Sequence, residues 1–151
     1  MGLAAFRRLF KRSHPGPGRD RRVHPRIIPS AGTTVLVVDD STTARHLMTG
    51  MLRQSGYRTL EAADGARGIA LARSQRPNLI FMDVMMPGMD GFQATRKLQA
   101  DRLTQGIPVI IISGNRQATI RTWVEKIGAR GFLEKPFQRG EFFLRLESAI
   151  Y

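Results

Sequence analysis

Five short runs with strand character, the second of them weaker, are each followed by a segment with helical spacing, and this alternation most constrains what the chain can fold into. The runs lie at residues 34–38, 57–62, 78–82, 108–112 and 131–134. Val- and Ile-rich runs without polar alternation are typical of strands buried on both faces. The segments between them place an apolar residue every three or four positions, as amphipathic helices do. This alternation predicts an α/β protein with a doubly wound, five-stranded parallel sheet covered by helices on both faces.

Helix boundaries are marked by capping and breaking residues. The helix expected over 42–55 has Ser41 or Thr42 as its N-cap and Gly56 at its end. An Asp64-Gly65 turn precedes the second helix.

Polar residues follow four of the predicted strands. Strand one ends in Asp39 and Asp40, strand three in Asp83, strand four in Ser113 and strand five in Lys135. Ligands of open α/β sheets bind beyond the carboxyl ends of the strands, so these side chains are expected to converge. Each also has an ordinary explanation, as a helix cap, a solvated loop residue or a surface lysine. Their joint occurrence favours a functional site.

The residue types in this set indicate phosphoryl chemistry. Three nearby carboxylates repel one another unless a cation compensates them, and carboxylate oxygens with water suit Mg²⁺. A lysine beside such a site is placed to bind phosphate charge. One carboxylate can then act as a nucleophile towards phosphorus and form an aspartyl phosphate. Asp83 is the candidate, because it stands alone at the end of the central strand.

With these residues the chain resembles a receiver domain of a bacterial two-component response regulator. The resemblance rests on VLVVDDS at 35–41, LIFMDVMMPGMDGF at 79–92, PVIIIS at 108–113 and GARGFLEKPF at 128–137. Within the family, GFQATR at 91–96 and the region of Trp123 look most like chemotaxis-type single-domain regulators of type IV pilus twitching motility. The resemblance implies a flavodoxin-like sheet with strand order 2-1-3-4-5.

The resemblance also implies how the phosphoryl site is built. Asp83 would accept the phosphoryl group, and Asp39, Asp40, Asp83 and the backbone carbonyl of Met85 would hold Mg²⁺ or Mn²⁺. Lys135 would pair with the phosphoryl oxygens.

A second group of implied roles concerns the switch and its lifetime. Ser113 would move to hydrogen-bond the phosphate, and Phe132 would swing inward behind it. The Lys135–Pro136 bond would be cis, which X–Pro bonds allow at a small cost. Met85 and Asn115 occupy positions that tune dephosphorylation. Neither is acidic, so we expect a long-lived phosphoryl state.

The implied partners are a histidine kinase or phosphotransfer domain and a downstream protein target. The target would dock on the helix carrying Ile120, Val124 and Ile127, on strand 131–134 and on the last helix. A switch of this kind is not an enzyme. The alternative from another class is a Mg²⁺-dependent phosphatase that works through an aspartyl phosphate, as haloacid-dehalogenase phosphatases do. Those enzymes separate their first-strand acids by one residue, whereas Asp39 and Asp40 are adjacent.

The net charge of +12 is concentrated in a basic N-terminal extension. Residues 1–32 carry +7 of it, and we expect the receiver domain at 33–151. Residues 13–32 are rich in Pro and Gly and are typical of a linker. Residues 2–12 have the pattern of a short basic amphipathic helix, suited to an anionic membrane surface or a partner groove. A frayed, solvated tail explains them equally well.

The sequence also bears on nucleic acid and location. The basic tail makes non-specific nucleic-acid contact an alternative function, but it has no helix-turn-helix or finger pattern. The chain ends at Tyr151, directly after the last predicted helix, so no sequence-specific DNA binding is expected. The absence of Cys excludes a disulfide scaffold, and no apolar run is long enough to span a membrane. We therefore expect a cytoplasmic protein, with the tail offering peripheral attachment to the inner membrane.

Overall fold

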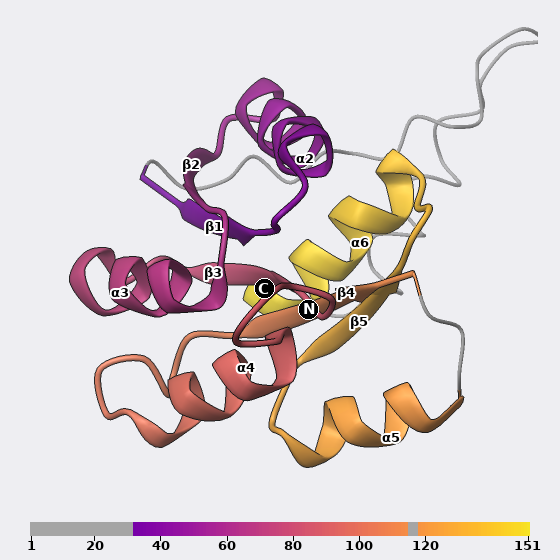
Figure 1. Ribbon diagram of the computed structural model, residues 1–151. Coiled ribbons are helices and arrows are strands. Elements are labelled where there is room, and N and C mark those ends of the chain that lie inside the picture. The colour runs from indigo at the N-terminus through magenta and orange to yellow at the C-terminus, as the bar shows by residue number, and fades with distance from the viewer. Residues whose placement is uncertain (1–31, 115–117) are drawn as a thin grey trace, which may run out of the picture.

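Strands and helices alternate along the chain in the computed structural model, which describes residues 32–114 and 118–151 (Figure 1). The elements are β1 (Thr34–Val38), α2 (Thr42–Gln54), β2 (Arg58–Ala62), α3 (Gly65–Gln75), β3 (Leu79–Asp83), α4 (Gly91–Ala100), β4 (Val109–Ser113), α5 (Ala118–Lys126), β5 (Gly131–Glu134) and α6 (Arg139–Ile150). All strand pairs are parallel, in the order β2-β1-β3-β4-β5. The predicted fold class and strand order are confirmed.

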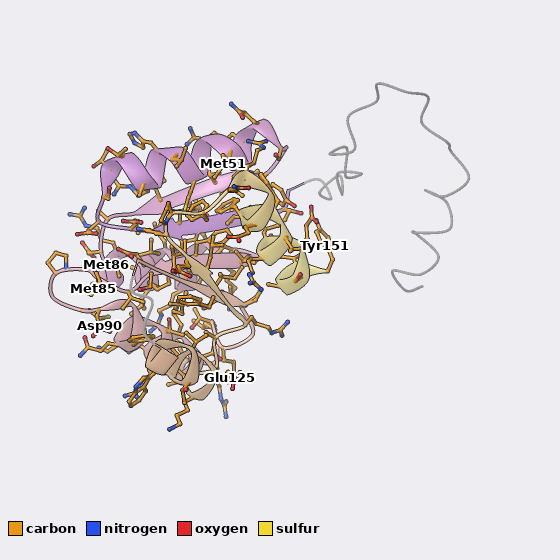
Figure 2. All side chains as sticks on the ribbon, turned by 90° about the vertical axis from the view of Figure 1, so that its right-hand side faces the viewer. Met51, Met85, Met86, Asp90, Glu125 and Tyr151 are labelled. Atoms are coloured by element: carbon orange, nitrogen blue, oxygen red, sulfur yellow. The ribbon has the colours of Figure 1, made fainter. Side chains whose placement is uncertain are left out.

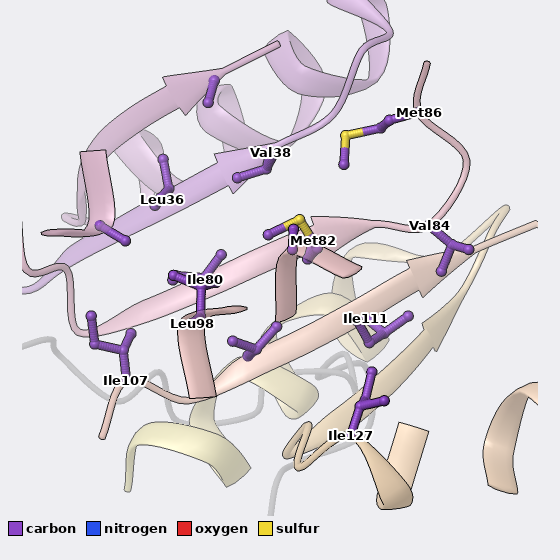
Figure 3. Packing of buried hydrophobic residues seen from close by; sticks show 14 of the residues in the cluster. Leu36, Val38, Ile80, Met82, Val84, Met86, Leu98, Ile107, Ile111 and Ile127 are labelled. Atoms are coloured by element: carbon purple, nitrogen blue, oxygen red, sulfur yellow. The ribbon is translucent and has the colours of Figure 1, made fainter. Parts of the chain in front are cut away.

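The helices form two layers around the sheet. Helices α2 and α6 cover one face, and α3, α4 and α5 cover the other (Figure 1). Alternate residues of each strand point to opposite faces, so Val37 and Phe81 pack towards α2 and α6. Leu36, Ile80 and Ile111 pack on the other side, where Figure 3 shows them with Leu98 of α4. Burial on both faces explains why the central strands are almost purely apolar.

Side-chain caps set the starts of three helices. Ser41 caps α2 by accepting a hydrogen bond from the Ala44 N–H at 3.2 Å. Asp64 caps α3 in the same way, so Gly65 is the first residue of the helix rather than part of a turn. Asp90 caps α4 and forms a capping box with Gln93. The polar residues before these helices thus fix where each begins.

Three strands differ slightly from their predicted bounds. β3 continues through Asp83 and β4 through Ser113, because these residues still pair in register with Ile112 and Glu134. β2 begins at Arg58, one residue late, since the Tyr57 N–H donates to the Leu52 carbonyl at the end of α2. Asp83 and Ser113 are therefore held by the sheet ladder itself.

An aromatic stack fixes α6 against the sheet. The ring centroids of Phe81 in β3 and Phe142 in α6 are 4.5 Å apart, and Phe137 stacks on Phe142 at 5.5 Å.

Among the described helices, none combines the length and apolar character that crossing a membrane requires. The predicted helix at 2–12 and all but the last residue of the predicted linker at 13–32 lie outside the described residues.

Candidate functional site

Three carboxylates meet at the carboxyl edge of the sheet. Asp39 and Asp40 follow β1, and Asp83 ends β3 beside it. One oxygen from each lies within 4.8 Å of the others, and among the described residues this group has the arrangement of a metal site. Asp39 and Asp83 are buried, whereas Asp40 is exposed. Topology thus brings the predicted acids together, with solvent access on the Asp40 side.

Asp39 is the most completely held member of the cluster. Its Oδ1 accepts a hydrogen bond from the Ser41 N–H at 2.9 Å, and its Oδ2 accepts one from Lys135 Nζ at 2.8 Å. Its own N–H donates to the Ala62 carbonyl of β2 at 3.1 Å. A fully buried carboxylate is tolerated only with partners of this kind.

Lys135 links the two buried acids. It follows β5, where its N–H donates to the Ser113 carbonyl, and its Nζ lies 3.5 Å from Asp83 Oδ1 as well as 2.8 Å from Asp39. Burial alone would lower the pKa of Lys135. The hydrogen bond to Asp39 and the charges of both carboxylates outweigh it and raise that pKa, so the amine stays cationic. The lysine predicted to face phosphate thus faces the two buried acids directly.

Asp83 is under electrostatic strain. Burial, and after it the charge of Asp39, raises the pKa of Asp83 from 3.8 to about 6, although Lys135 partly opposes the change. At neutral pH the carboxylate is mostly ionised, at a cost that any added cation would relieve.

Gly91 brings the start of α4 close to Asp83. A Cβ at position 91 would collide with the Asp83 carbonyl oxygen, so only glycine fits this approach. The Gly91 N–H donates to the Val84 carbonyl at 3.0 Å, which closes the loop from β3 to α4. Figure 2 shows Met85, Met86 and Asp90 of this loop on the opposite side of the molecule from Tyr151.

The predicted switch residues lie on the next two strands. Ser113 is buried at the end of β4, and Phe132 of β5 pairs with Ile111 and packs, half-buried, against the core beneath α3, α4 and α5. Phe132 thus shares a core with α5. Its strand, β5, lies two strands away from β3, which carries Asp83.

The other positions singled out in the sequence are Met85, the Lys135–Pro136 bond, Asn115 and Trp123. The Met85 side chain is 73% exposed, and the Lys135–Pro136 peptide bond is cis. Asn115 lies outside the described residues. Trp123 lies on α5. It is 47% exposed, with Arg96 of α4 and Lys126 of α5 each under 6 Å from its ring centroid.

Two residues near the cluster were not predicted from the sequence. Arg45 of α2 donates from Nη1 to the Asp39 carbonyl at 2.7 Å, and Glu61 of β2 lies 3.4 Å from Arg45 Nε. Both sit in segments identified only by their apolar spacing. The one signal in the sequence is Glu61 itself, an acidic residue inside a strand whose other charged residue is Arg58 at its start.

The site fits a hard divalent cation. Its donors are carboxylate oxygens, which Mg²⁺ prefers, and the exposed Asp40 leaves room for the water ligands that Mg²⁺ retains. Burial and then the charge of Asp39 raise the pKa of Asp83 although Lys135 opposes them, so a further cation at this edge would favour the ionised carboxylate.

A doubly wound α/β sheet with strand order β2-β1-β3-β4-β5 and an acidic, lysine-bridged cluster at its carboxyl edge defines the class as an α/β domain of the flavodoxin-like type. The chain belongs to the response regulator receiver domain family, whose model matches residues 35–147. Members of this family are in general signalling regulators that bind Mg²⁺ at an acidic site, take a phosphoryl group from a phosphodonor and act on a downstream target.

Named relatives differ in how much of their length this chain spans. It is 46% identical over 116 residues to the protein PilH of Pseudomonas aeruginosa, covering 77% of this chain and 95% of PilH. It is 39% identical to the response regulator PleD of Caulobacter vibrioides, where 76% of this chain matches 25% of PleD. The similarity to PilH therefore concerns nearly a whole protein, and the similarity to PleD only a part.

Two solved structures share the fold. The chemotaxis protein CheY4 of Vibrio cholerae superposes with a TM-score of 0.73 at 30% identity, covering 80% of this chain and 100% of CheY4. The receiver domain of the sensor histidine kinase PA1611 of Pseudomonas aeruginosa also gives 0.73, at 33% identity, covering 80% and 98%. That receiver domain has a magnesium ion coordinated in its active-site cleft.

Proposed function

We propose that Asp83 accepts a phosphoryl group from a histidine kinase or phosphotransfer domain, and that the phosphorylated protein signals by changing a protein-binding surface. The observation that carries the proposal is the gathering of Asp39, Asp40 and Asp83 within 4.8 Å, with Lys135 in contact with two of them. The family makes phosphoryl transfer the natural use of such a cluster.

The residues divide the chemistry between them. An ionised Asp83 oxygen attacks phosphorus while the bond from phosphorus to the donor's imidazole nitrogen breaks. The donor ring already carries a proton on its other nitrogen, so it keeps the electron pair of the broken bond and leaves as neutral imidazole. Lys135 lies 3.5 Å from Asp83 and is placed to neutralise the phosphoryl oxygens. A Mg²⁺ or Mn²⁺ ion held by Asp39, Asp40, Asp83 and the Met85 carbonyl supplies further charge neutralisation when bound.

The direct test is phosphorylation by acetyl phosphate with Mg²⁺, followed by intact-mass measurement. We expect one phosphoryl group per chain, none in Asp83→Asn, and none when a chelator removes the metal. Asp90→Asn is the matched control, since Asp90 lies in the same loop and Asn caps a helix as well as Asp does. Uptake by Asp83→Asn equal to that of the native chain would sink the proposal.

A second assay, hydrolysis of a generic phosphomonoester, distinguishes the proposed switch from the enzymatic alternative. A phosphatase would hydrolyse a generic phosphomonoester over many turnovers and lose that activity in Asp83→Asn. A switch takes up one phosphoryl group and stops. Sustained release of phosphate from the ester would therefore replace the proposed function with hydrolysis.

The proposed output surface consists of α5, β5 and α6, with Ser113 and Phe132 linking it to the phosphoryl site. Two large apolar side chains support it, Trp123 on α5 and Leu144 on α6, because both are about half exposed. We expect Trp123→Ser and Leu144→Ser to weaken binding to the target while phosphorylation stays intact. Leu47→Ser is the control, since Leu47 is equally exposed but lies on α2.

The phosphoryl state is proposed to be long-lived. The exposed Met85 side chain cannot act as a base for an attacking water, and Asn115 has no acidic group. Met85→Glu should therefore lose the phosphoryl group several-fold faster, whereas Met85→Gln should not. Equal decay in both variants would contradict this role.

The pathway is proposed to be control of twitching motility. Similarity to PilH over nearly the whole of that protein supports this assignment. Replacing the native gene with its Asp83→Asn form should change the twitching zone, and the Asp90→Asn form should not. A normal twitching zone in the Asp83→Asn strain would contradict the assignment.

We propose that residues 1–32 form an extension separate from a receiver domain at 33–151. The protein would be cytoplasmic, and residues 2–12 would attach it peripherally to an anionic membrane. The net charge of +7 in 1–32 supports this. In co-sedimentation with vesicles containing anionic lipid, Arg7→Glu with Arg8→Glu should reduce binding. Equal binding to neutral vesicles would contradict it.

A further inference from the structure

Both backbone polar groups of Asp39 are held from the side of α2 and β2. Its N–H donates to the Ala62 carbonyl at 3.1 Å, and its carbonyl accepts a hydrogen bond from Arg45 Nη1 at 2.7 Å. The Arg45 side chain is only 15% exposed, unlike a typical surface arginine. The peptide unit that joins Asp39 to Asp40 is therefore tied to the guanidinium of α2.

Glu61 anchors that guanidinium. It pairs with Val37 across the β1–β2 ladder, so its side chain points to the same face as Val37, towards α2. Its Oε1 lies 3.4 Å from Arg45 Nε. Oε1 accepts no hydrogen bond, so this contact is an ion pair. Because a guanidinium is a rigid planar fork, attraction of its Nε side to Glu61 favours the orientation in which Nη1 reaches the Asp39 carbonyl.

We infer that Arg45, anchored by Glu61, is a positioning residue that holds the Asp39–Asp40 turn in the geometry the divalent cation needs. The inference rests on the proposed metal site and goes beyond it, because Arg45 donates none of the ligands. Groups that orient the ligands of a metal typically change its affinity about 10–100-fold when removed.

The sign of the effect separates positioning from simple electrostatics. A guanidinium near a cation site repels the cation, so removing the charge alone would tighten Mg²⁺ binding. Loss of positioning weakens it instead. A merely structural tie between α2 and β2 would lower the melting temperature and leave the Mg²⁺ affinity of the folded protein unchanged.

The chain contains a matched control in Arg53. It lies on the same helix and approaches the same Glu61, at 3.8 Å, but its side chain is 62% exposed. Its Nε donates a hydrogen bond to Thr59 Oγ1 of β2 at 2.9 Å, away from the Asp39–Asp40 turn. Arg45→Met and Arg53→Met thus remove the same charge and differ in the hydrogen bond to the Asp39 carbonyl.

The test is titration of each full-length variant with Mg²⁺ alone, by calorimetry and by the Mg²⁺-dependent rise in melting temperature. We expect Arg45→Met to bind Mg²⁺ about 10-fold more weakly than the native chain. Arg53→Met should bind as the native chain does. If Arg45→Met does not fold, Arg45→Gln replaces it, with the same weakening expected.

The outcomes separate the two proposals. No Mg²⁺ binding by the native chain would overturn the proposed metal site and this inference together. Native binding with unchanged or tighter binding in the Arg45 variant would overturn the inference alone. An equal loss in Arg45→Met and Arg53→Met would also overturn it, since it would assign the effect to the Glu61 ion pairs.

Discussion

The carboxyl edge of the sheet has a charged half and a neutral half. Strand β3 ends in Asp83, and β1 is followed directly by Asp39 and Asp40. In the half that we call neutral, β4 ends in the uncharged Ser113 and β5 carries Phe132, which pairs with Ile111, although the last residue of β5 is the acidic Glu134. Asp83 and Ser113 are both buried at the ends of neighbouring strands, but only Asp83 carries a charge that burial penalises. Ionisation of Asp83 is therefore opposed by its surroundings, while Ser113 and Phe132 carry no charge to separate when they move.

Lys135 is the residue that joins the two halves. It belongs to the neutral half by its backbone, through the N–H bond to the Ser113 carbonyl, and to the charged half by its side chain. A change in charge at Asp83 thus acts directly on the end of β5. Variants on either side of this lysine should differ in the sign and size of their effects.

The largest effect is expected for Lys135→Met. It leaves the fully buried Asp39 without its cation, and removing one partner of a buried pair costs about 3 kcal/mol. The melting temperature without Mg²⁺ should fall by about 10 °C. Lys135 also opposes the rise in the pKa of Asp83, so the loss should be greater above pH 6 than near pH 4.

Thermal unfolding at the two pH values checks this, with Lys97→Met as a control at an exposed lysine of α4. Melting temperatures that match in the two lysine variants would show that the cluster does not depend on its cation, and the contrast between the halves would disappear.

The next effect has the opposite sign. The folded pKa of Asp83 is about 6 and its ordinary value 3.8, so ionisation destabilises the fold above about pH 6, and the penalty fades as the pH falls towards 4. Asp83→Asn should therefore stabilise the metal-free protein at pH 7.5, by up to about 3 kcal/mol. The gain should vanish near pH 4.

Denaturant unfolding across that pH range measures the difference, with Asp90→Asn as the reference. An Asp83→Asn variant that is no more stable than the native chain at pH 7.5 would mean that the charged half is not strained.

The membership of both halves could be predicted because it follows from topology. Once five parallel strands are recognised, residues directly after them must share one edge, which places Asp39, Asp83 and Lys135 together without any knowledge of side chains. The Arg45–Glu61 contact could not be predicted in this way. It depends on how far a long side chain reaches from α2 across to β2, and apolar periodicity carries no information about that.

Trp123 shows a second limit of prediction. Its angle on the helix predicts only that the ring lies near the edge of the apolar stripe. Arg96 of the neighbouring α4 and Lys126 of α5 also lie over the ring, and such cation–π contacts hold an aromatic ring at the surface. The spacing of apolar residues along one helix does not reveal what the next helix offers.

A smaller effect on stability is expected in the neutral half. Ser113→Ala removes a buried hydroxyl and should cost about 1 kcal/mol at most, at any pH. Phosphorylation of Asp83 should proceed as in the native chain, whereas binding to the target should no longer depend on it. Measuring uptake from acetyl phosphate beside target affinity checks both. Loss of uptake in Ser113→Ala would place Ser113 in the charged half.

The smallest signal comes from Trp123, the one tryptophan of the chain, which reports on α5. Val124 of α5 shares a core with Ile111, and Phe132 packs against that core, so movement of Phe132 should alter how α5 presents the ring. Beryllofluoride with Mg²⁺ should change acrylamide quenching of its fluorescence in the native chain. Asp83→Asn should lose the response because nothing binds, and Ser113→Ala should lose it although beryllofluoride still binds. A response that persists in Ser113→Ala would mean that the two halves communicate by a route other than the end of β4. The remaining route is Lys135, which follows β5 in the chain and whose Nζ lies 3.5 Å from Asp83 Oδ1.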